Sequence, residues 1–158
     1  MTFIKSIIND SNKILLKKYG PPAPELLISD RSSIKVAFVD TETTGIDRKN
    51  DHIIEIAVKV LCFETSSGKI LSVEGSYESF NDPEEDISTE ITHLTGIDNK
   101  MVDGKFIDWN KVDALIQGVD IIIAHNASFD RAFIDRFSSI SPSKVWACSI
   151  SDIDWLER

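Results

Sequence analysis

The chain has 158 residues, 42% of them hydrophobic and 27% charged, which is the size and composition of one ordinary globular domain. Its net charge of −9 argues against a protein that binds nucleic acid through a broad basic surface. Carboxylates that hold divalent cations would, however, change the local charge of a site. The longest apolar stretches, residues 36–39 and 121–124, are too short to span a bilayer, and the N-terminus is unlike a secretory signal.

The first nineteen residues predict an amphipathic helix, because apolar side chains recur at helical spacing. These are Phe3, Ile4, Ile7, Ile8, Ile14 and Leu15. Gly20-Pro21-Pro22 would end the helix, and residues 21–33, with three prolines and a polar run, are typical of a linker. Residues 1–33 are therefore expected to lie outside the main domain, where they are candidates for docking a polymerase or another protein partner.

From Ile34 onward the chain alternates strand and helix patterns. Residues 34–40 form a short apolar strand of the kind covered on both faces. The further expected strands are 52–65, 70–80, 119–124 and 144–150, and the expected helices are 88–94, 109–117 with Asp108 as N-cap, 128–137 and a beginning at 151–158. Residues 34–158 therefore predict an α/β domain, a mixed β-sheet flanked by helices.

Two cysteines are too few for a disulfide framework. Cys62 and Cys148 both lie among apolar residues, which indicates buried reduced thiols. Free thiols are typical of a reducing compartment, so a cytoplasmic location is expected.

Two acids end the first strand of this domain. Asp40 and Glu42 are two residues apart, so their side chains project to the same side of the strand. Neighbouring carboxylates repel each other unless a cation lies between them, and Mg²⁺ and Mn²⁺ prefer oxygen ligands. A metal site is one interpretation; an exposed acidic strand end with a Thr-rich turn is the other.

A third carboxylate, Asp130, follows the buried strand 121–124 in the first turn of the next helix. There it would lie at the edge of the sheet, near the positive end of the helix dipole, and could complete a three-carboxylate site with Asp40 and Glu42. An acid that only favours the start of its helix is the simpler alternative for this position.

Together these segments resemble the DnaQ-like, DEDD-type 3′–5′ exonucleases, the group that includes the proofreading epsilon subunit of bacterial DNA polymerase III. Phe38 to Gly45 is similar to the family's first motif, an apolar strand followed by Asp-x-Glu-Thr-Thr-Gly, and His125 to Asp130 is similar to its second, His-Asn-Ala-x-Phe-Asp. Residues 53–57, 91–97 and 146–148 resemble the segments beside these motifs. The resemblance implies a ribonuclease H-like fold.

The resemblance also implies an activity, metal-dependent hydrolysis of the terminal phosphodiester at a 3′ end of nucleic acid. DNA is the expected substrate, although no motif in the sequence distinguishes DNA from RNA. Asp40, Glu42 and Asp130 would be catalytic ligands of two divalent ions, Mg²⁺ or Mn²⁺. The substrate would be a single-stranded or frayed 3′ end, and roles in DNA replication or repair would follow. Candidate substrate-binding residues are Thr41, Thr43, Thr44 and Phe129.

The family's third motif is a helix with a His or Tyr and, a few residues later, a fourth Asp. Nothing after Asp130 matches it, and His125 is interpreted as structural. We therefore expect the domain to be truncated here and the natural product to extend past Arg158. The alternative is a catalytically weak domain that only binds nucleic acid or a protein. A haloacid-dehalogenase-like phosphatase also pairs acids at a strand end, but it would leave 126–130 unexplained.

Overall fold

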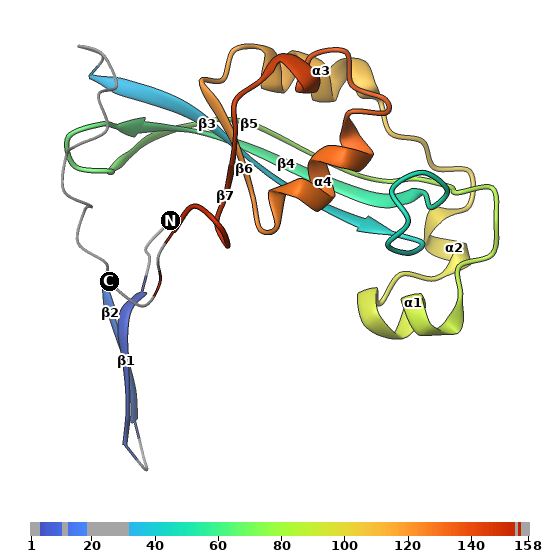
Figure 1. Ribbon diagram of the computed structural model, residues 1–158, viewed down its shortest axis with the longest axis horizontal. Helices are drawn as coiled ribbons and strands as arrows, with labels where there is room; N and C mark the ends of the chain where they lie inside the picture. Colours follow the sequence, from blue (N-terminus) through green and yellow to red (C-terminus); the bar gives the residue numbers. More distant parts are fainter. Residues whose placement is uncertain (1–3, 11–12, 19–31, 154, 156–158) are drawn as a thin grey trace.

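The computed structural model describes residues 4–10, 13–18, 32–153 and 155. Its largest element is a five-stranded mixed sheet with the strand order β5-β4-β3-β6-β7 (Figure 1). Antiparallel pairing joins β3 to β4 and β4 to β5, whereas β6 runs parallel to β3 and β7 parallel to β6. The strands are β3 Ser33–Thr43, β4 Ile53–Glu64, β5 Ile70–Phe80, β6 Ile121–Ala124 and β7 Trp146–Cys148.

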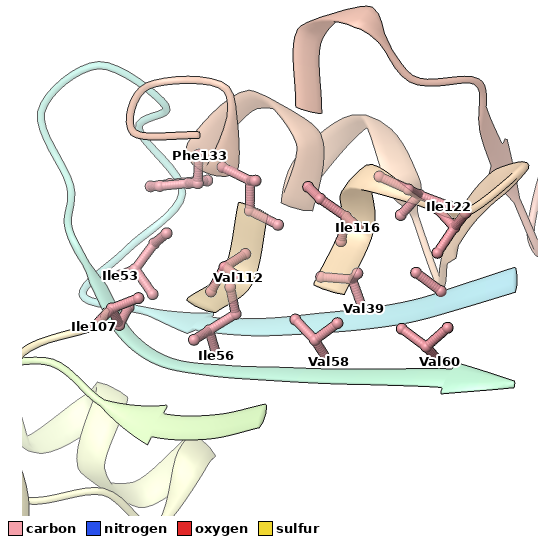
Figure 2. Close-up of a cluster of buried hydrophobic side chains, with 13 residues drawn as sticks. Val39, Ile53, Ile56, Val58, Val60, Ile107, Val112, Ile116, Ile122 and Phe133 are labelled. Atoms are coloured by element: carbon pink, nitrogen blue, oxygen red, sulfur yellow. The ribbon is translucent and has the colours of Figure 1, made fainter. Parts of the chain in front are cut away.

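One face of the sheet is covered by α3, Trp109–Gln117, and α4, Ala127–Ile134 (Figure 1). Figure 2 shows the resulting core, in which Val39, Ile56 and Val58 from the strands meet Val112, Ile116 and Phe133 from the helices. The expected helix 109–117 is confirmed, and Asp108 accepts a hydrogen bond from the Lys111 amide as its N-cap. The helix predicted at 128–137 ends earlier, at Ile134.

Two short helices, α1 Thr89–Thr95 and α2 Asn99–Val102, form a separate layer near one end of the sheet (Figure 1). A second core cluster lies here, in which Ile54 packs with Val102 of α2 and with Ile87 and Ile97 from the segments on either side of α1. Ile91 of α1 is partly buried against it. A β-bulge makes this possible, because the register between β3 and β4 shifts between Glu42 and Thr43. The bulge reverses the alternation of β4, so that Ile53, and not Ile54, joins Ile56 in the first core, while Ile54 enters the second.

The other face of β3 and β4 has a different character. Val39 faces the helices, while Phe38, one residue earlier, is only half-buried and Asp40, one residue later, is exposed. Ala57 and Lys59 share this face with them and line a shallow groove together with Phe38 and Asp40. The strand predicted at 34–40 is present. It was expected to be covered on both faces, but within the described residues α3 and α4 cover only one of them.

The helix predicted for the first nineteen residues is wrong. In its place the structure has two antiparallel strands, β1 Ile4–Asp10 and β2 Lys13–Lys18. The sequence Asn9-Asp10-Ser11-Asn12 consists of residue types favoured in turns, and the isoleucines on either side are β-branched, so strand pairing prevails over the helical periodicity. The proposed linker at 21–33 lies mostly outside the described residues.

The last expected helix, at 151–158, is also not formed in its described part. Residues 149–153 form turns in which the Asp152 carboxylate accepts a hydrogen bond of 2.7 Å from the Cys148 amide at the end of β7. Of the cysteines, Cys62 is buried, Cys148 is half-buried, and both are free thiols. No helix in the described ranges is long and apolar enough to cross a membrane.

The core in Figure 2 predicts a strong dependence of stability on Phe133, which is fully buried. Phe133→Ala is expected to lower the free energy of unfolding by about 3–5 kcal/mol, because it removes buried area and leaves a cavity. Phe106→Ala, at a side chain that is 68% exposed, should change it by only about 0.5 kcal/mol. Urea denaturation of both variants measures the difference, and equal losses would contradict this account of the core.

Candidate active site

The end of β3 presents different residues to its two faces. Thr41 and Thr43 are buried on the helix side, while Asp40 is exposed and Glu42 half-buried on the other side. Asp40 and Glu42 thus lie on the same side of the strand, as the sequence predicts. Glu42 is directly opposite Glu55 of β4, next to the β-bulge.

Asp130 connects this strand end to α4. Its Oδ1 atom accepts two hydrogen bonds from Thr41, one from the backbone amide at 3.0 Å and one from the hydroxyl at 2.8 Å. The Asp130 residue is only 2% exposed, so these donors compensate for the removal of its carboxyl group from water. Asp130 therefore lies beside the strand end that carries Asp40 and Glu42.

Three carboxyl groups near this strand end, those of Asp130, Glu42 and Glu55, have raised pKa values. Burial raises the pKa of Asp130 from 3.8 to about 6, and the negative charge of Asp40 adds to the effect, although the hydrogen bonds from Thr41 act in the opposite direction. Burial and then Asp40 also raise the pKa of Glu42. The pKa of Glu55 is raised by burial first and then by Glu78, Glu42 and Asp40. Burial is the largest cause of each shift, and the negative charges of neighbouring acids add to it. A cation among these acids would relieve the repulsion between them.

Hydrogen bonds and limited space in the turn after β3 account for the residue types of the Thr43-Thr44-Gly45 sequence. Thr43 Oγ1 donates to the carbonyl of Gly45 at 2.5 Å, and Thr44 Oγ1 accepts from the His52 amide at 3.0 Å. A Cβ atom at residue 45 would lie 2.8 Å from Cγ of Asp51, so only glycine fits there without displacing the Asp51 side chain. The hydroxyls of Thr41, Thr43 and Thr44 thus all bond to protein atoms.

The start of α4 is the second part of the site. Asn126 has φ 67° and ψ 49°, a left-handed conformation that Asn tolerates better than most residues, and it turns the chain from β6 into the helix. His125 is exposed, with Nδ1 2.9 Å from Ser149 Oγ. Phe129 is half-buried, with its ring centroid 5.0 Å from that of Phe133.

Asp40, Glu42 and Asp130 are the residues here that could hold a metal. Their donor set consists of carboxylate oxygens, which suits hard ions such as Mg²⁺ and Mn²⁺, and their raised pKa values at Glu42 and Asp130 fit a site that a cation completes. In the described part of the chain, no three His, Cys, Asp or Glu side chains are already arranged as metal ligands.

Two features of this region were not predicted from the sequence. Glu55 lies across from Glu42, and the segment Ile53–Ala57 had been matched only as a strand of the family. Arg48 donates to Ser128 Oγ at 3.4 Å, which places the loop after β3 against the start of α4. Sequence spacing gives no signal for Arg48, because its partner is 80 positions away.

The sequence of the chain is similar to those of known proteins. Residues 37–139 match the family model RNase_T, described as Exonuclease. The chain is 39% identical over 100 residues to the PolC-type DNA polymerase III of Clostridium perfringens, and 40% identical over 109 residues to that of Caldanaerobacter subterraneus. These matches cover 61% and 65% of this chain but only 6% and 7% of the polymerases.

A solved exonuclease structure shares the fold. An exonuclease I from Methylocaldum szegediense superposes with a TM-score of 0.51 at 17% identity, over 74% of this chain and 28% of that chain. A structure of exonuclease X in complex with 5′-overhanging duplex DNA has a TM-score of 0.49 at 26% identity, over 72% of this chain and 58% of that one. The first likeness supports the ribonuclease H-like architecture expected from the sequence.

The raised pKa of Asp130 predicts how stability depends on pH in metal-free protein. A carboxyl whose pKa is higher in the folded state favours folding most below its unfolded pKa, near 4, and this contribution is lost as the pH rises through about 6. Asp130→Asn keeps an acceptor for Thr41 but does not titrate. The difference in unfolding free energy between wild type and Asp130→Asn should therefore change between about pH 4 and pH 6 and be constant above.

Urea unfolding at a series of pH values in the presence of a chelator measures this difference. Asp103→Asn, at an exposed residue remote in sequence from the site, is the matched control and should run parallel to wild type across the same range. A wild-type profile parallel to that of Asp130→Asn would contradict the raised pKa.

Proposed function

The chain belongs to the exonuclease family, and on that premise we propose that it is a metal-dependent 3′–5′ exonuclease. It would hydrolyse the terminal phosphodiester at the 3′ end of nucleic acid, with DNA preferred, and release nucleoside monophosphates. The observation that supports this most directly is the buried carboxyl of Asp130, held by Thr41 beside the two acids at the end of β3.

Divalent ions are the cofactors that enzymes of this family use, and Asp40, Glu42 and Asp130 are the residues proposed to hold two of them. When bound, such ions supply an activated water and neutralise charge on the phosphate and on the leaving 3′ oxygen. They would also explain how a chain with a net charge of −9 accepts a polyanion.

The protein's own contribution is to position these carboxylates. Thr41 fixes one oxygen of Asp130 through two hydrogen bonds, so the orientation of that carboxyl does not depend on a ligand. Asp40 and Glu42 are fixed by the pairing of β3 with β4 on one side and, up to Phe38, with β6 on the other. Phe129 and the backbone of the turn at Thr43 and Thr44 are proposed to contact the terminal nucleotide.

The biological setting is a proposal drawn from relatives whose names identify them as DNA polymerases. A replication or repair role in the cytoplasm, with a single-stranded or frayed 3′ end as substrate, is consistent with that relationship and with two free thiols. Residues 1–33 remain our proposed contact to a polymerase or another protein.

A second candidate is a domain that binds nucleic acid without cleaving it. The two candidates differ in a single measurement, the release of nucleotides from a bound strand.

A 5′-labelled single-stranded oligonucleotide incubated with the protein and Mg²⁺ or Mn²⁺ should shorten stepwise from its 3′ end, and a chelator should stop the reaction. Asp40→Asn and Glu42→Gln are expected to reduce the rate by about 100-fold or more, because losing a metal ligand exceeds the 10–100-fold effect typical of residues behind the ligands. Product ladders on a denaturing gel measure this.

Glu90→Gln, an exposed acid in the first turn of α1, is the matched control and should cleave as wild type does. Calorimetric titration with Mn²⁺ provides a readout independent of activity, and Asp40→Asn should bind the ion more weakly than Glu90→Gln. Protein that binds both metal and oligonucleotide but leaves the strand intact would refute the exonuclease proposal in favour of the binding domain.

A further inference from the structure

The loop between β3 and β4, residues 44–52, is attached to both ends of α4. We propose that Arg48 in this loop is a further substrate-binding residue, which contacts a backbone phosphate of the bound strand. This inference rests on the proposed function and adds a cationic contact to a site otherwise described by its acids.

The loop has a defined internal structure. The Asp47 carboxylate accepts from the Lys49 amide at 2.9 Å and from the Asn50 side-chain amide at 2.8 Å. Asp51 Oδ2 accepts from the Asp47 amide at 2.6 Å, and the backbone amide of Asp51 donates to the Asp47 carbonyl. The carboxylates of Asp47 and Asp51 therefore accept hydrogen bonds from within the loop and stabilise its turn. Arg48 is part of this turn.

Arg136 anchors this turn to the far end of α4. Its Nη1 donates to the carbonyl of Asp51 at 2.6 Å and to the carbonyl of Arg48 at 3.3 Å. The Arg136 guanidinium carbon also lies 5.7 Å and 5.3 Å from the ring centroids of Phe133 and Phe137. The Arg136 guanidinium thus positions the backbone of Arg48.

The Arg48 side chain reaches the opposite end of α4. Its Nη2 donates to Ser128 Oγ at 3.4 Å, and Ser128 is two residues before Asp130 on the same helix. The guanidinium carries five N–H donors, and this is the one hydrogen bond recorded for it among the described residues. The residue is exposed, so the remaining donors face solvent at the start of α4.

A cation at this position does not stabilise the helix. The start of a helix carries a partial positive charge, so positively charged side chains are favoured at the other end. Within the described ranges no ion pair engages the Arg48 guanidinium either. A planar guanidinium with open donors is suited to a phosphate, which it can bind through two parallel hydrogen bonds.

The negative charge of the neighbouring acids would make a cationic contact favourable for binding a nucleic-acid strand. Asp40, Glu42 and Glu55 would repel the phosphates of an approaching strand wherever metal ions do not neutralise them. Arg48, held next to the helix that carries Asp130, supplies an attractive charge at the same end of β3. It would act on the affinity for the strand rather than on the binding of metal.

The test is fluorescence anisotropy with a single-stranded oligonucleotide carrying phosphorothioate linkages at its 3′ end, in Mg²⁺ and over a range of salt. Arg48→Ala is expected to raise the Kd about tenfold and to reduce the slope of log K against log salt by about 0.7, the value for one phosphate contact to a single strand. Arg48→Lys should keep the salt slope but recover only part of the affinity.

Lys69→Ala is the matched control. Lys69 is an exposed cation in the turn between β4 and β5, at the opposite end of the sheet from the loop, and its removal should leave both Kd and salt slope at wild-type values. Mn²⁺ affinity and the urea midpoint of Arg48→Ala should also stay close to wild type, because the guanidinium contacts none of the proposed metal ligands and its hydrogen bond to Ser128 is long and exposed.

The outcomes separate this inference from the proposed function. Wild-type affinity and salt slope in Arg48→Ala, in a protein that still shortens oligonucleotides, would overturn the role of Arg48 and leave the exonuclease proposal standing. A fall in stability and Mn²⁺ affinity together with oligonucleotide affinity would show Arg48 to be structural and also overturn it. Wild-type protein that neither binds nor cleaves would refute both.

Discussion

The two hydrogen bonds from Thr41 to Asp130 are the interaction on which the rest of the site depends. They join residues 89 positions apart and fasten α4 to β3 at the point where β6 no longer accompanies that strand, since the pairing of β3 with β6 is recorded only from Val36 to Phe38. The Thr41 amide would otherwise lack a partner on that side, and the buried Asp130 carboxyl would lose two of its hydrogen bonds. Thr41 and Asp130 therefore supply hydrogen-bond partners to each other.

The strand that carries Thr41 serves two different surfaces. Its residues alternate between a core formed with α3 and α4 and a face on which Asp40 and Glu42 lie near Glu55. The same alternation that buries Val39 therefore exposes Asp40. A rigid, apolar strand interior holds the acids in place, which is the arrangement expected of a site that must keep like charges close together.

The sequence predicted the main sheet well, because its strands are long or strongly apolar and its helices have clear apolar stripes and caps. It also placed Asp40 and Glu42 on one side of a strand, which depends only on local geometry. It failed where local patterns conflict, as in the N-terminal segment, whose spacing is helical but whose residue types form paired strands. Arg48 and Glu55 could not be recognised, because their partners are set by tertiary register and not by spacing. The roles of the candidate ligands remain predictions.

The β-bulge opposite Glu42 has a consequence for how this domain can change its length over evolution. One extra residue at this point places Ile53 in the core under α3 and α4 and turns Ile54 toward the cluster beside α1 and α2. Deleting that residue or inserting another would reverse the facing of the residues beyond it and withdraw side chains from both cores. The turn at 65–69, by contrast, can gain or lose residues without moving either core. Length variation among relatives should therefore be tolerated at one end of β4 and eliminated by selection at the other.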